Sequence, residues 1–92
     1  MTYKVRLTKR AHKKLDRLGG EVRERINRAL RRLADYYDGE TVPPPDVKIL
    51  KGKYQNLLRL RVGDLRVIFK IENDVFVIIV IDIVPRGDAY KE

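Results

Sequence analysis

Residues 58–70, LRLRVGDLRVIFK, constrain the fold more than any other part of the chain. Apolar side chains alternate with arginines on both sides of Gly63-Asp64, which is the period of half-buried β-strands. A Gly-Asp pair between two such runs is typical of a tight hairpin turn. A two-residue loop places Arg61 directly opposite Arg66. The segment therefore predicts an antiparallel hairpin whose register is set by its turn.

The same alternation predicts a strongly basic face on this hairpin. Arg59, Arg61, Arg66 and Lys70 fall on one side, because cross-strand partners share a face. Two arginines placed opposite each other repel, so the arrangement favours a bound anion, with phosphate as the first candidate. Two alternatives stay open. The arginines could form a solvated face paired with acids from elsewhere, or a register slip of one residue could move Arg66 to the other side.

Length and charge narrow the class of protein. Ninety-two residues predict a single domain over residues 1–92 with one modest core. The net charge of +8 indicates an acidic partner: nucleic acid first, an acidic protein second and an anionic membrane surface third. The charge is uneven, since residues 1–32 hold twelve Lys or Arg against three acids.

Cysteine usage and hydropathy indicate where the protein works. There is no cysteine, which excludes a disulfide scaffold and a Cys-based zinc site and fits a reducing compartment. The start of the chain does not resemble a signal peptide, and the longest apolar run, residues 75–81, is too short to cross a bilayer. We therefore expect a cytoplasmic protein with no membrane partner.

Helix and strand signals alternate in a simple order. Residues 3–7 alternate as a short strand, and Thr8 is a good N-cap for a helix that ends at Gly19-Gly20. A second helical period runs from Glu21 to about residue 37. After a proline-rich loop, residues 47–50 predict a short strand ahead of the hairpin.

The remaining segment completes the predicted fold. Asn73-Asp74 suggests another hairpin turn, and the apolar residues 75–84 predict a central strand that Pro85 stops. The expected class is α+β: an N-terminal strand, a two-helix hairpin, then a three- to four-stranded antiparallel sheet with the helices on one face. The apolar side of the hairpin would meet the helices, and its arginine side would face outward.

Most common active-site patterns are missing. The single histidine, His12, lies among lysines on the first helix, where a solvated role is expected. There is no phosphate loop and no HExxH motif. Asp82 and Asp88 flank the end of the last strand but make a weak metal pair. We therefore predict no metal and no cofactor.

What is left is a set of residues directed at phosphate. Cleavage of RNA needs a base for the 2′-hydroxyl, cations for the charge developing on phosphorus, and a proton for the leaving oxygen. Crowded positive charge lowers the pKa of a nearby tyrosine, so Tyr90 is a candidate base, although a terminal aromatic can also simply pack on the sheet. The candidate residues are Lys51, Lys53, Arg59, Arg61, Arg66, Arg86 and Tyr90.

Two sequence blocks also resemble a known family. The block RLRVGDLRVIF at residues 59–69 and the ending PRGDAYK at residues 85–91, with the LKG turn at residues 50–52, resemble the RelE/ParE superfamily of toxins, and in particular the archaeal branch of RelE-type mRNA endoribonucleases. The similarity covers nearly the whole chain. It implies a RelE-like fold of the microbial ribonuclease type.

The resemblance also implies an activity and roles for residues. Such toxins enter the ribosomal A site and cut mRNA through attack of the 2′-hydroxyl on the adjacent phosphate, without a metal. By motif position Arg66 would stabilise the phosphate, Arg86 would lie near the leaving group and Tyr90 would be the base. Arg59 corresponds to one of the family's sheet lysines. Lys51, Lys53 and Arg61 are expected to bind RNA.

The sequence departs from the family at two positions. Leu57 stands where a catalytic lysine is common, and whether Lys51 or Lys53 replaces it stays open. Pro85 replaces a histidine often found before the terminal arginine. The implied partners are a cognate antitoxin, the ribosome with its mRNA, and rRNA.

Two other functions remain open. A ParE-like toxin would inhibit DNA gyrase without catalysis on the same fold, although such relatives usually lack the terminal Arg and Tyr. A basic module that binds RNA or an antitoxin without cutting is the third possibility, and steep salt dependence without cleavage would favour it.

Overall fold

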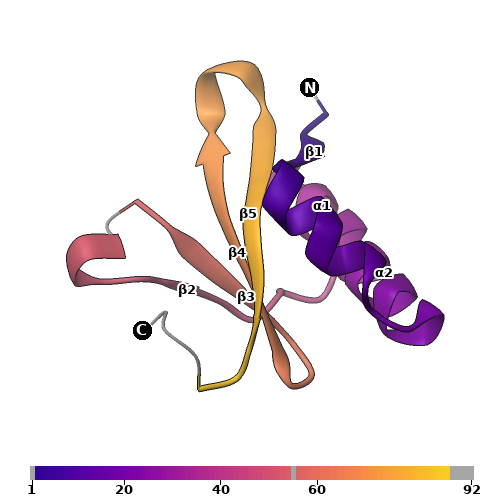
Figure 1. Cartoon of the computed structure of the whole chain (residues 1–92). Helices are drawn as coiled ribbons and strands as arrows, with labels where there is room; N and C mark the ends of the chain where they lie inside the picture. Colours follow the sequence, from indigo (N-terminus) through magenta and orange to yellow (C-terminus); the bar gives the residue numbers. More distant parts are fainter. Residues whose placement is uncertain (1, 55, 88–92) are drawn as a thin grey trace.

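Two helices and a five-stranded sheet make up the part of the chain that the structure describes, residues 2–54 and 56–87 of a computed structural model (Figure 1). The elements in chain order are β1 (Lys4–Leu7), α1 (Lys9–Asp16), α2 (Gly20–Tyr37), β2 (Val47–Ile49), the 3₁₀ turn η1 (Gly52–Tyr54), β3 (Leu58–Val62), β4 (Leu65–Glu72), the 3₁₀ turn η2 (Asn73–Val75) and β5 (Val77–Pro85).

The strands lie in the order β1-β5-β4-β3-β2. The pairs β2–β3, β3–β4 and β4–β5 are antiparallel, as the sequence predicts. The N-terminal strand β1 adds to the edge of β5 in the parallel direction, so the sheet is mixed and not purely antiparallel. The α+β class, with the helices packed on the sheet, is confirmed.

The predicted hairpin register is confirmed. Val62 pairs with Leu65 and Arg61 with Arg66, so the loop is the two residues Gly63 and Asp64. Gly63 has φ of +59°, a left-handed conformation that glycine adopts without strain. The chemistry of the turn therefore sets which side chains of β3 and β4 share a face.

The helix boundaries follow their caps. The Thr8 hydroxyl accepts a hydrogen bond from the Ala11 backbone N–H at 3.2 Å, which is the N-cap that the sequence predicts. Helix α1 ends at Asp16, earlier than Gly19-Gly20, and α2 already begins at Gly20. The two glycines thus lie at the start of α2 instead of ending α1.

The main core lies between the sheet and the two helices. The apolar side chains predicted for the inner side of the hairpin pack into it, as expected, and so does Tyr37 at the end of α2. Burial raises the pKa of the Tyr37 phenol. The most deeply buried core residues are Ala11, Ile26, Leu33, Val67, Phe69, Ile78 and Val80.

A β-bulge in β5 changes which side chains face this core. Phe69 pairs with Val80 but Ile68 pairs with Asp82, so Ile81 is an extra residue in β5. Without that residue the alternation would point Asp82 at the helix-side core. With it, Ile83 faces the core and Asp82 faces the opposite side.

Neither helix in the described residues is both long enough and apolar enough to span a membrane.

Candidate functional site

The side of the sheet away from the main core, here called the outer face, carries two rows of side chains. Because cross-strand partners share a face, the pairing register defines these rows. The first row runs across four strands through Lys48, Arg59, Ile68 and Asp82. The second row runs through Arg61, Arg66 and Val84. The basic hairpin face predicted from the sequence is therefore present, but it is interrupted by apolar residues.

Arg59 is not an outward-facing cation. It is only 4% exposed, and its Nη1 donates hydrogen bonds to the backbone carbonyl and to the Oδ1 of Asp46, both at 2.9 Å. The hydrogen bond from Arg59 lowers the pKa of the Asp46 carboxyl. Arg59 thus ties the loop before β2 to the sheet. For this arginine the structure agrees with the alternative stated above, in which the basic residues of the hairpin are paired with acids from elsewhere in the chain.

Arg61 and Arg66 are the two arginines of the second row. They lie directly opposite each other, Arg61 being exposed and Arg66 half-buried. Nη1 of Arg66 donates to the neighbouring Leu65 carbonyl at 3.3 Å. Like charges on directly opposed residues repel, so an anion bound beside both would stabilise the arrangement.

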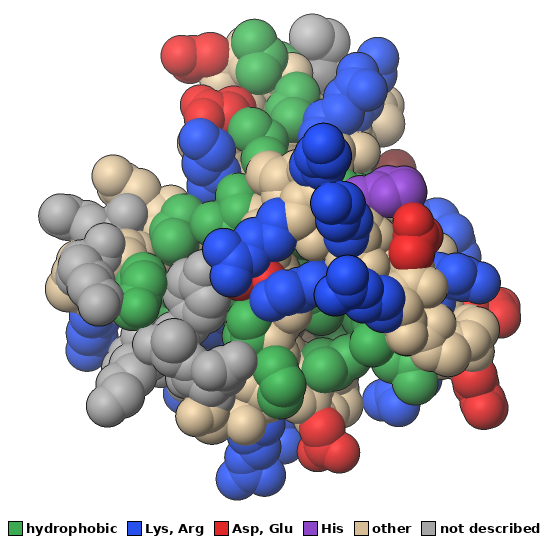
Figure 2. Space-filling model, viewed as in Figure 1, with side chains coloured by type: hydrophobic (Ala, Val, Ile, Leu, Met, Phe, Trp, Pro, Cys, Tyr) green, Lys and Arg blue, Asp and Glu red, His purple; other side chains and the backbone are tan. Residues whose placement is uncertain are grey.

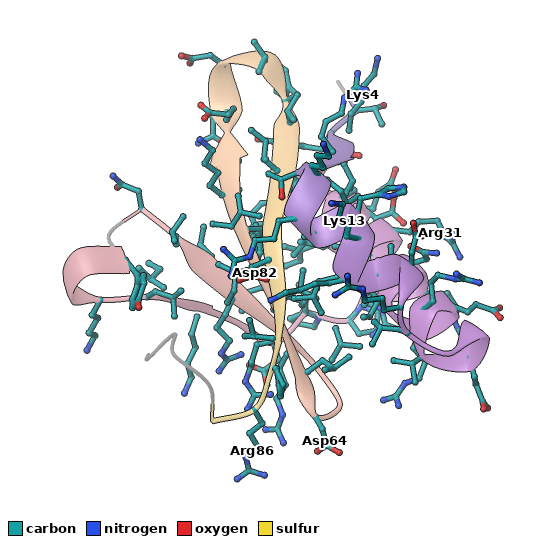
Figure 3. The ribbon with its side chains drawn as sticks, in the orientation of Figure 1. Lys4, Lys13, Arg31, Asp64, Asp82 and Arg86 are labelled. Atoms are coloured by element: carbon teal, nitrogen blue, oxygen red, sulfur yellow. The ribbon has the colours of Figure 1, made fainter. Side chains whose placement is uncertain are left out.

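Arg86 lies at the same end of the sheet as this pair. Leu65 pairs with Pro85, and the next residue, Arg86, donates its backbone N–H to the Asp64 carbonyl at 2.8 Å. Figure 3 shows the Arg86 side chain projecting beyond the end of the sheet, beside the hairpin turn that carries Asp64. The structure thus brings the two separate sequence blocks together. Tyr90 lies outside the described residues.

The turn between β2 and β3 supplies less charge than its lysines suggest. Leu57, at the position where the resemblance implies a lysine, packs with Leu50, Ile68 and Val84 in a small apolar cluster on the outer face. Lys51 is exposed at the start of the turn. The side chain of Lys53 lies outside what the structure describes. The alternation does not predict this cluster, because it places Ile68 on the same side of β4 as Arg66 and Lys70.

Asp82 forms a buried ion pair that was not predicted from the sequence. Its carboxylate is buried and lies 2.6 Å from Lys14 Nζ and 3.5 Å from Arg10 Nε, both on α1. Strand β1 ends opposite Val80, so α1 runs beside the rest of β5 and its cations reach Asp82. Figure 2 shows Lys and Arg side chains gathered over α1, and Figure 3 shows Asp82 beside that helix.

The signal for this pairing was available in the sequence. A carboxylate inside an apolar strand needs a counter-charge, and α1 is rich in lysine and arginine. Among the described residues no three His, Asp or Glu side chains form a group that could hold a metal. His12 is exposed beside Asp16, with 3.2 Å between Nδ1 and Oδ2, in agreement with a solvated role.

Comparison with known proteins decides the family. The family model described as "ParE toxin of type II toxin-antitoxin system, parDE" matches residues 5–90. The chain belongs to this toxin family. No curated protein matches the sequence. The family match agrees with the RelE/ParE superfamily assigned from the two sequence blocks.

Solved structures place the toxin beside archaeal RelE proteins. The RelE chain of the RelE–RelB complex from Pyrococcus horikoshii is 32% identical, with a TM-score of 0.72 over 97% of this chain and 100% of that one. RelE in the RelB–RelE complex of Methanococcus jannaschii is 25% identical, with a TM-score of 0.66 over 87% of this chain and 88% of that one. The isolated E. coli RelE toxin is 18% identical, with a TM-score of 0.65 over 95% of this chain and 87% of that one, which shows the shared fold.

Proposed function

We propose that this toxin is a metal-independent endoribonuclease that cuts mRNA on the ribosome and so inhibits translation. The observation that carries the proposal is the meeting of Arg61, Arg66 and Arg86 at one end of the sheet, although Arg86 is 20 residues or more from the other two along the chain. The similarity to archaeal RelE proteins over nearly the whole chain supports it.

The proposed reaction is a transesterification. The 2′-hydroxyl oxygen forms a bond to the adjacent phosphorus, the bond from phosphorus to the 5′-oxygen breaks, and a 2′,3′-cyclic phosphate is left. The hydroxyl proton goes to a base and the leaving oxygen gains a proton. We assign the base to Tyr90, by the resemblance, and the stabilisation of charge on phosphorus to Arg66.

Arg86 and Arg59 have different roles in this proposal. Arg86, exposed at the hairpin turn, would lie beside the leaving group. Arg59 is hydrogen-bonded to Asp46. We therefore propose that Arg59 holds the loop before β2 in place and does not contact the phosphate directly. Lys51, Lys53 and Arg61 would bind RNA on either side.

We also propose that a cognate antitoxin binds this toxin. The related toxins from P. horikoshii and M. jannaschii were solved in complex with RelB. The net charge of +8 favours an acidic or amphipathic partner. A toxin that acts on translation would work in the cytoplasm.

Primer extension on translated messages tests the nuclease proposal. The toxin should produce codon-aligned cuts that disappear in an Arg66→Ala/Arg86→Ala double variant. Single changes to alanine at Arg66, Arg86 or Tyr90 should each lower activity by tenfold or more, which is about 1.4 kcal/mol at the transition state per decade. Cuts that persist in the double variant would reject the proposed roles.

One observation favours a second function. The matching family model is named for ParE, and we keep inhibition of DNA gyrase as the alternative. A supercoiling assay with purified gyrase separates the two. Inhibition of gyrase with no RNA cleavage would favour the ParE-like function, and cleavage with uninhibited gyrase would favour the nuclease.

A further inference from the structure

A second basic site lies at the edge of the sheet, between the hairpin and α2. A cleft of about 340 Å³ opens between α2 and the end of β3. Four arginines line it, with Ala29, Val62 and Gly63 between them. We call it the arginine cleft, and its cations are Arg25, Arg28, Arg32 and Arg61.

The helix presents three of these arginines in one row. Arg25, Arg28 and Arg32 are spaced i, i+3 and i+7, so they share one side of α2 and span about 10 Å of its length. All three are exposed. None of the cleft arginines forms an ion pair with an acid among residues 2–54 and 56–87, and no acidic side chain lines the cleft.

The end of β3 and the hairpin turn form the other wall of the cleft, opposite α2. Strand β2 begins opposite Leu60, so Arg61 and Val62 lie past its end, at an open sheet edge, and both line the cleft there. A Cβ on Gly63 would come within 2.9 Å of Arg25 Nη2, so the Arg25 guanidinium lies against the turn and would have to shift if Gly63 carried a side chain. In Figure 1 the hairpin turn and α2 lie on the same side of the molecule.

We propose that the arginine cleft binds the phosphodiester backbone of an RNA strand, away from the site of cleavage. This inference rests on the proposed nuclease function. Guanidinium groups bind phosphate oxygens in a two-pronged geometry that suits a row of arginines. Arg61 belongs both to the cleft and to the outer face, so it connects this second contact to the proposed cutting site.

The lining favours RNA over an acidic peptide. An amphipathic helix docks through apolar anchors, and Ala29 and Val62 are the only apolar side chains that line the cleft within the described part of the chain. A phosphate backbone requires mainly positive charge. A protein partner is therefore kept as an outcome of the test.

The test measures affinity for RNA that cannot be cut. The probe is a single-stranded oligonucleotide of roughly ten 2′-O-methyl riboses, a common site size for single-strand binding. The variant Arg28→Gln/Arg32→Gln should bind it about tenfold or more weakly at 0.1 M salt. The slope of log affinity against log salt should become shallower by about 1.4, because each single-strand phosphate contact contributes roughly 0.7.

The matched control removes the same charge from α2 at two positions that do not line the cleft. Arg23 and Arg31 are exposed and do not line the cleft, and Figure 3 shows Arg31 projecting away from the sheet. Arg23→Gln/Arg31→Gln should change RNA affinity by less than about threefold, as expected for loss of solvent-screened charge that makes no direct phosphate contact. Equal weakening in the two doubles, or no weakening in either, would overturn the proposal.

Two further arms separate the possible failures. If the cleft double loses affinity for a poly-glutamate peptide but keeps its affinity for the RNA probe, the cleft is a protein site and the proposal is wrong. If the unaltered toxin cuts no RNA, but Arg28→Gln/Arg32→Gln still binds the probe more weakly than the control variant, the proposed nuclease function is wrong and the proposed RNA site in the cleft is supported. If the toxin cuts RNA and both doubles bind normally, only the cleft fails.

Discussion

The pairing of Asp82 with α1 shows how one buried carboxylate orders its surroundings. The Asp82 side chain is 2% exposed and lies between Lys14 and Arg10, of which Lys14 is the nearer and the less exposed. A buried ion pair adds little to stability compared with an apolar pair, but removing one partner leaves the other charge uncompensated. Lys14 therefore matters more for stability than its neighbours on the helix.

Replacing Lys14 tests this expectation. Lys14→Met should lower the free energy of unfolding by about 2–4 kcal/mol, because the buried carboxylate of Asp82 would lose the nearer of the two cations on α1. Urea denaturation measures the change. The matched control Lys13→Met alters an exposed lysine on the same helix and should change stability by less than about 0.5 kcal/mol. Equal effects of the two substitutions would show that the ion pair contributes nothing specific.

The bond between Arg59 and Asp46 predicts a dependence on acid. The pKa of Asp46 is lowered in the folded protein, so its contribution to stability is present above the unfolded value, near 4, and is lost as pH falls through the folded value. Urea midpoints measured from pH 6 downward should therefore fall more steeply for the natural protein than for Asp46→Asn. Parallel curves for the two proteins would contradict this assignment.

At the scale of elements, the hairpin of β3 and β4 organises both sites. Its two-residue turn sets Arg61 opposite Arg66 on the outer face and holds Gly63 against Arg25 in the arginine cleft. The backbone of Arg86 is attached to the same turn through Asp64. A change in the turn should therefore be felt on both sides of the sheet.

Gly63→Ala tests the turn. It should destabilise the fold by about 1–2 kcal/mol, because an L-residue is strained at positive φ and the new Cβ would displace Arg25. Gly20→Ala is the matched control, since Gly20 starts α2 with nothing within 4 Å of the added Cβ. That control should be neutral or more stable by up to about 1 kcal/mol. Chemical denaturation of both variants gives the comparison, and equal midpoints would refute the role of the turn.

At the scale of the whole molecule, positive charge covers more than one surface. The chain has a net charge of +8. Its Lys and Arg side chains lie on the outer face, on helix α1 and in the arginine cleft, among other places. Self-repulsion of this kind destabilises the compact state and is relieved by bound anions. Stability should therefore depend on the kind of anion as well as on ionic strength.

Thermal unfolding in phosphate and in chloride tests this dependence. At matched ionic strength, inorganic phosphate should raise the Tm by roughly 2–5 °C more than chloride, because it binds the folded arginine sites and so stabilises the folded state by mass action. Differential scanning fluorimetry is sufficient. Identical Tm values in the two salts would indicate that the arginines act only through their general field.

Several parts of the fold followed from neighbouring residues alone. The hairpin register came from alternation and the Gly63-Asp64 turn, and the start of α1 came from the Thr8 cap. These features depend on local geometry, in which each residue is constrained mainly by those beside it. The parallel placement of β1 did not follow, since it depends on where a strand meets a partner some 70 residues away.

The sequence by itself therefore determined the elements, the basic hairpin and the family, because alternation, turn chemistry and motif blocks are written in short stretches. Tertiary structure decided which partners the charged side chains have and on which face of the sheet they lie. It buried Arg59 against Asp46, turned Asp82 to the outer face through one extra residue in β5, and placed α2 beside Gly63. The sequence shows that a carboxylate inside an apolar strand needs a counter-charge, but which distant element approaches to supply it is decided only by the folded chain.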